Sequence, residues 1–70
     1  MTTRRKSRLL TELAMILRKI AVKEVLGKKA RIIYWVTQPE EEYKNQLLEM
    51  VKEEGFPQAH LVKRNIIVDL

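Results

Sequence analysis

The stretch Ala30-Arg31-Ile32-Ile33-Tyr34-Trp35-Val36-Thr37 decides the fold of this 70-residue chain. From Ile32 to Val36, β-branched and aromatic residues follow one another without a polar interruption, and such residues favour the extended conformation. A strand that is apolar on both faces is typical of the interior of a sheet. The stretch is therefore predicted to be a central strand.

Before this strand, a helical pattern begins after Ser7, which suits the N-cap position, and ends near Gly27, which suits a helix C-terminus. The spacing predicts a helix with one apolar side. That side consists of Leu9, Leu10, Leu13, Ala14, Ile16, Leu17, Ile20 and Ala21. The other side is expected to carry Arg8, Arg18, Lys19 and Lys23, with Glu12 among them.

After the strand, Thr37-Gln38-Pro39-Glu40 predicts the start of a second helix. Thr37 and Glu40 have the spacing of a capping box, and Pro39 suits the first helical turn. Gly55 is expected to end the helix. Its buried stripe is predicted to consist of Tyr43, Leu47, Met50 and Val51, with Leu48 at the margin.

The last segment, residues 58–70, holds two short apolar groups around Lys63-Arg64-Asn65. A hairpin that turns at Arg64-Asn65 would place Leu61 opposite Val68, Val62 opposite Ile67 and His60 opposite Asp69. One long, bent strand is the alternative.

The element order is thus α-β-α-β-β, which predicts an α+β fold: a two-layer sandwich with both helices packed on one face of a small mixed sheet. Residues 7–70 are expected to form this single domain, and residues 1–6 are expected to form a basic flexible arm. A fourth strand would form if residues 2–6 paired with the sheet.

A two-layer sandwich leaves one face of the first strand without helices. Either Ile32, Tyr34 and Val36 or Ile33 and Trp35 must point away from the helices, and neither set is polar. We therefore expect a homodimer or a partner protein to cover this face, with Ile33 and Trp35 as interface residues.

The residue types that catalysis requires are scarce. The chain has no cysteine, and His60 is its only histidine, which excludes thiolate nucleophiles and sites built from several cysteine or histidine ligands. Ser7, the only serine, lies far along the chain from His60 and Asp69, so no catalytic triad is expected. We predict a non-enzymatic, cytoplasmic protein without metal or cofactor. Because Arg18 and Lys19 interrupt the longest apolar stretch, no membrane-spanning helix is expected.

The charges are distributed unevenly along the chain. Residues 1–31 hold ten basic and two acidic residues, a net charge of +8, whereas residues 32–70 hold four basic and seven acidic residues, a net charge of −3. Such a concentration of cations favours a polyanionic partner. We predict contact with nucleic-acid backbone through the arm and the first helix. The residues expected to bind are Arg4, Arg5, Lys6, Arg8, Arg18, Lys19 and Lys23.

The alternative is a protein-interaction or regulatory module that docks through its apolar sheet face. In that case the cations would serve only solubility. Tyr34 and Trp35 are the candidates for stacking against bases, but packing in the core or in a dimer is the favoured role for both.

As a whole, residues 10–70 resemble the small TusA/SirA-like sulfur-carrier family. The resemblance rests on LAMILRK at residues 13–19, on Gly27 before the strand, on Gln38-Pro39 and on Gly55 before a terminal hairpin. It implies a two-layer α/β sandwich. The family carries sulfur on the cysteine of a Cys-Pro-x-Pro motif, and the matching positions here are Leu10, Thr11, Glu12 and Leu13. The resemblance therefore implies the fold without the sulfur-transfer activity.

Overall fold

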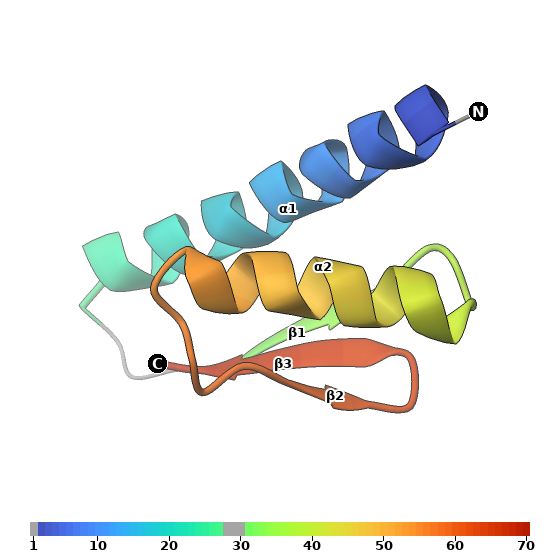
Figure 1. The fold of residues 1–70 in the computed structure, drawn as a ribbon. Helices are drawn as coiled ribbons and strands as arrows, with labels where there is room; N and C mark the ends of the chain where they lie inside the picture. The colour runs from blue at the N-terminus through green and yellow to red at the C-terminus, as the bar shows by residue number, and fades with distance from the viewer. Residues whose placement is uncertain (1, 28–30) are drawn as a thin grey trace.

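The computed structural model describes residues 2–27 and 31–70, with side chains from residue 6 onward. The elements are α1 (Thr2–Val25), β1 (Arg31–Trp35), α2 (Glu41–Glu53), β2 (His60–Val62) and β3 (Asn65–Asp69). This is the predicted order, and both helices lie on one side of the sheet (Figure 1). The α+β two-layer fold is confirmed.

The sheet is antiparallel throughout, in the order β1-β3-β2. The expectation of a mixed sheet was wrong, and so was the placement of β1 at the centre. The central strand is β3, because the chain passes from β1 through α2 to β2 and then returns between the two strands through a hairpin. β1 is an edge strand, although its sequence is apolar on both faces.

Residues of β1 alternate strictly between the two faces of the sheet. Ile32, Tyr34 and the following Val36 are buried beneath the helices, whereas Ile33 and Trp35 are 55% and 62% exposed. Of the two orientations that the sequence allowed, the structure has the second. The face that carries Ile33 and Trp35, here called the outer face, is open in the single chain.

The core lies between the helices and the inner face of the sheet. The apolar stripe predicted for α1 supplies Leu9, Leu13, Ile16 and Ile20, and α2 supplies Tyr43, Leu47 and Val51. Met50 and Leu48 of α2 are only partly buried. The sheet contributes Ile32, Tyr34, Val36, Ile66 and Val68.

α1 begins at Thr2 rather than after Ser7. Residues 2–6 therefore continue the helix, which is a correction to the expected loose arm and to the idea of a fourth strand. Neither glycine nor proline occurs in this segment to interrupt the helix. The carbonyl of Ser7 accepts a hydrogen bond from Thr11 Oγ1 at 2.9 Å, so Ser7 lies inside the helix.

α2 begins at Glu41 with Glu40 as N-cap residue, and no side chain caps this end. The predicted capping box does not form, and Pro39 precedes the N-cap instead of occupying the first turn. The reason lies in α1, because the Thr37 backbone N–H donates to Glu12 Oε1 at 3.1 Å. Thr37 is thereby held in the link between β1 and α2.

The terminal hairpin forms, but it turns at Lys63-Arg64 and pairs Leu61 with Ile66 and Val62 with Asn65. The predicted register was wrong by two residues, a shift that leaves every side chain on its expected face. Two contacts fix the observed turn. The carbonyl of Arg64 accepts from Val36 N at 2.9 Å, and the carbonyl of Lys63 accepts from Nζ of the buried Lys44 at 3.1 Å.

Candidate nucleic-acid interface

A groove of about 460 Å³ lies between the C-terminal half of α1 and the first residues of β1. Among the residues that the structure describes, seven line this groove; four of them are cations and none is acidic. The cations are Arg18, Lys19 and Lys23 of α1 and Arg31 of β1, and the apolar lining residues are Val22, Ile32 and Ile33. We call this site the cationic groove.

Helical spacing places the α1 cations along the groove. Lys19 and Lys23 are four residues apart, which puts them on the same side of the helix about 6 Å from each other along its axis. Lys19 Nζ lies 5.8 Å from the centroid of the Tyr34 ring, close enough for a weak cation–π interaction. Lys19 thus lies over a residue of β1 while it remains exposed.

Arg31 comes to the groove from the start of β1. Its Nε donates to Asp69 Oδ1 on the neighbouring strand at 2.8 Å, and the two side chains are 61% and 49% exposed. An ion pair this exposed contributes little to stability. Arg31 can therefore bind an incoming phosphate, either in place of the Asp69 carboxylate or in addition to it, at a small cost in free energy.

Three of the seven cations predicted from the sequence, Arg18, Lys19 and Lys23, meet in this groove. Arg8 and Lys6 are exposed on the N-terminal half of α1. Arg4 and Arg5 are part of the same helix, but the structure describes only their backbone. The sequence analysis missed Arg31, whose only signal was its position at the start of a strand next to a basic helix.

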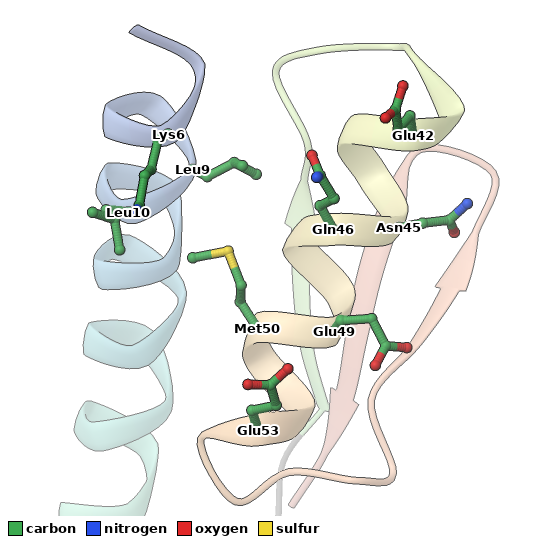
Figure 2. A pocket seen from close by; sticks show the side chains of 9 residues that line it. All are labelled: Lys6, Leu9, Leu10, Glu42, Asn45, Gln46, Glu49, Met50 and Glu53. Carbon is green, nitrogen blue, oxygen red and sulfur yellow. The ribbon is translucent and has the colours of Figure 1, made fainter. Parts of the chain in front are cut away.

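A second and larger groove, of about 850 Å³, separates the N-terminal part of α1 from α2. Figure 2 shows Leu9 and Met50 extending from the two helices into the space between them. The charged residues described as lining this larger groove are Lys6, Glu42, Glu49 and Glu53. The excess of carboxylates makes this groove unsuitable for an anion.

The expected neighbours His60 and Asp69 do not meet. With the observed register, His60 lies opposite Ile67, and its Nδ1 is 3.2 Å from the carbonyl of Gln58. Asp69 lies opposite Arg31 and binds it. Among the described residues, no three histidine, cysteine or acidic side chains gather in a way that could hold a metal ion.

The most consequential polar group is one that the sequence analysis placed on the solvent side. Glu12 is only 3% exposed. Its Oε1 accepts a hydrogen bond from the Tyr34 hydroxyl at 2.8 Å, in addition to the one from Thr37 N, and its Oε2 accepts one from the Tyr43 hydroxyl. One carboxylate thus joins α1, β1 and α2.

This network also positions the cationic groove. The Tyr34 ring beneath Lys19 is fixed by its hydroxyl, which donates to Glu12, about two helical turns before Lys19 in α1. The hydrogen bonds therefore hold α1 against β1 beside the groove. A sequence gives no direct signal for such a network, because the three partners of Glu12 lie 22 to 31 residues away from it along the chain.

Burial and hydrogen bonding act in opposite directions on Glu12. Burial alone would raise its pKa, but the hydrogen bonds from Tyr43, from the Thr37 backbone and from Tyr34 hold the pKa below its ordinary value of 4.5. Burial and the Glu12 charge both raise the pKa of Tyr34 and of Tyr43 above the ordinary value of 10. Around neutral pH the network is a carboxylate with two neutral phenols.

The lowered pKa of Glu12 predicts a loss of stability in acid. A carboxyl whose pKa is lower in the folded state stabilises the fold above its unfolded pKa, and this contribution disappears as the pH falls through the folded pKa. In urea unfolding, the free energy of unfolding should therefore fall more steeply between neutral pH and about pH 3 for wild type than for Glu12→Gln. Glu24→Gln, on the exposed part of the same helix, should follow wild type. Parallel curves for wild type and Glu12→Gln would contradict the lowered pKa.

No helix in the part of the chain that the structure describes is long and apolar enough to cross a membrane. No protein-family model matches the chain, and neither the curated proteins nor the solved structures contain a significant match. The resemblance of residues 10–70 to sulfur carriers therefore stays a prediction.

Proposed function

We propose that this chain is a small non-enzymatic binding protein that contacts nucleic-acid backbone through the cationic groove and the basic side of α1. The observation that carries this proposal is the convergence of Arg18, Lys19, Lys23 and Arg31 on one groove, whose described lining residues include no acidic one. Phosphates that meet these cations would displace condensed counterions, which is the main source of sequence-independent affinity.

The distribution of charge between the elements supports the proposal. α2 presents exposed acidic residues, among them Glu41, Glu42, Glu49 and Glu53, whereas the groove between α1 and β1 is lined by cations. A molecule with separated charges has a stronger local field than its net charge of +5 would give if evenly spread. A polyanion would therefore approach with α2 directed away from it.

The length of α1 supports contact with several phosphates. Its 24 residues make a helix about 36 Å long at 1.5 Å per residue. Arg8 is exposed on the N-terminal half of this helix, and Lys19 and Lys23 lie in the groove at the other half. The backbone of one strand would thus follow α1 past the edge of β1.

Salt dependence tests the proposal. Binding of a labelled oligonucleotide, followed by fluorescence anisotropy, should weaken as salt is added. In the double variant Lys19→Gln/Lys23→Gln, the slope of log affinity against log salt concentration should become shallower by about 1.4 to 1.8. Each of the two lost phosphate contacts contributes about 0.7 to 0.9 to the slope. Lys52→Gln on α2 should leave the slope unchanged. No binding at low salt, or a slope unaffected by the double substitution, would contradict phosphate contact.

A second candidate function is a protein-interaction module, and the exposed outer face favours it. Ile33, Trp35 and Val62 are 55%, 62% and 47% exposed and come from the two edge strands of one small sheet. A second copy of the chain on this face would make the sedimentation coefficient depend on concentration. A coefficient that stays at the monomer value throughout would exclude the homodimer.

A further inference from the structure

The exposed Trp35 ring is held in place from one side. The Arg64 guanidinium stacks on it, with Cζ 4.4 Å from the ring centroid. Arg64 is itself fixed, because its Nε donates to the carbonyl of Val36 at 2.8 Å and its Nη2 donates to that of Thr37 at 2.7 Å. The tryptophan therefore stands on a rigid support while 62% of it remains exposed.

Trp35 and the cationic groove share one strand. Arg31, Ile33 and Trp35 occupy alternate positions on the outer face of β1, and both Arg31 and Ile33 also line the groove. At about 3.3 Å per residue, Arg31 and Trp35 are about 13 Å apart along the strand. A chain of two or three nucleotides spans such a distance when it is extended.

The α1 cations lie on the helix side of β1, Trp35 lies on its outer face, and Arg31 and Ile33 belong both to the groove and to the outer face. Cations and a fixed, exposed aromatic ring on the two sides of one edge strand fit a nucleic acid with unpaired bases. A duplex presents phosphates to the cations, but its bases are stacked inside and cannot reach a side chain on a sheet face. A single strand can place its backbone on the cations and a base on the indole. Stacking on an aromatic ring tolerates any base, because every base has a π-face.

We infer that the cationic groove binds single-stranded nucleic acid in preference to duplex, with one base stacked on Trp35. This inference rests on the proposed function and adds its substrate class. Backbone contact through Arg18, Lys19 and Lys23 supplies affinity for either form, and Trp35 supplies the preference for the unpaired strand.

The emission of Trp35 reports on stacking directly, because it is the only tryptophan of the chain. Titration with an oligothymidylate of about 12 nucleotides should quench this emission, and a duplex of equal length should leave it nearly unchanged. In anisotropy titrations of the labelled oligonucleotides, Trp35→Ala should weaken single-strand binding about 5- to 150-fold. Its affinity for duplex should stay within about twofold of wild type.

Val62→Ala is the matched control. Val62 lies opposite Asn65, which lies opposite Trp35, so the variant loses an exposed apolar side chain from the same row of the outer face. It should bind both forms as wild type does. Circular dichroism melts of the variants verify that they are folded.

The outcomes separate this inference from the proposed function. Binding of neither form at low salt would overturn both, whereas equal affinities of wild type and Trp35→Ala for the single strand would overturn the inference alone. Concentration-dependent sedimentation that is abolished by Trp35→Ala would also overturn it, since a second copy would then cover the indole.

Discussion

The Glu12→Ala variant is expected to lose at least about 2 kcal/mol of unfolding free energy. The substitution would remove the acceptor of two buried donors, the hydroxyls of Tyr34 and Tyr43, and of the partly buried backbone N–H of Thr37. Each unsatisfied buried donor costs about 1–3 kcal/mol. A single core of this size typically supplies only about 3–5 kcal/mol in total, so much of the variant should be unfolded.

Equilibrium urea unfolding, followed by circular dichroism, measures this loss. Glu24→Ala is the matched control, since it removes an exposed glutamate from the same helix and should cost less than about 0.5 kcal/mol. If unpaired hydroxyls cause the loss, adding Tyr34→Phe and Tyr43→Phe to Glu12→Ala should recover part of it. A Glu12→Ala variant as stable as the Glu24→Ala control would show that the network contributes nothing to folding.

The same glutamate shows how far the sequence could lead. Periodicity identified Leu9, Leu13, Ile16 and Ile20 correctly, but it also assigned Leu10 to the buried side, and Leu10 is 52% exposed. Glu12 lies beside that stripe, and the helical projection grouped it with the cations of the solvent side. Its burial depends on two tyrosines from other elements, and no local pattern reports such distant partners.

The predicted position of β1 was wrong for a different reason. Because the strand is apolar on both faces, it was expected at the centre of the sheet, but it lies at the edge, with Ile33 and Trp35 facing outward. Composition records that both sides of a strand are apolar, but it does not record whether the same chain covers them. The sequence therefore indicates that one apolar face of β1 lacks a covering layer within the chain. It does not indicate that β1 lies at the edge of the sheet.

Part of the candidate site was predictable and part was not. Lys19 and Lys23 share a helix side by spacing alone, so their proximity follows from the sequence. Arg31 joins them only because β1 lies beside the C-terminal half of α1. Arg64 likewise reaches Trp35 through a hairpin whose turn differs from the predicted one.

The adjacent residues Ile32 and Ile33 give the second prediction of large effect. They have identical side chains on opposite faces of β1, with exposures of 4% and 55%. Ile32→Ala should cost about 2–5 kcal/mol of unfolding free energy, because it opens a cavity in the core. In a monomer, Ile33→Ala should cost less than about 1 kcal/mol, because little apolar surface is buried there.

Urea unfolding of wild type and both variants, at two protein concentrations about a hundredfold apart, decides what lies on the outer face. For a monomer, the unfolding midpoints do not change with concentration, and only Ile32→Ala is strongly destabilised. If a second copy covers the face, the wild-type midpoint rises with concentration and Ile33→Ala removes the rise, because subunit association then contributes to stability. A large, concentration-independent loss in Ile33→Ala would contradict the two-layer arrangement, since only a residue packed within its own chain behaves in that way.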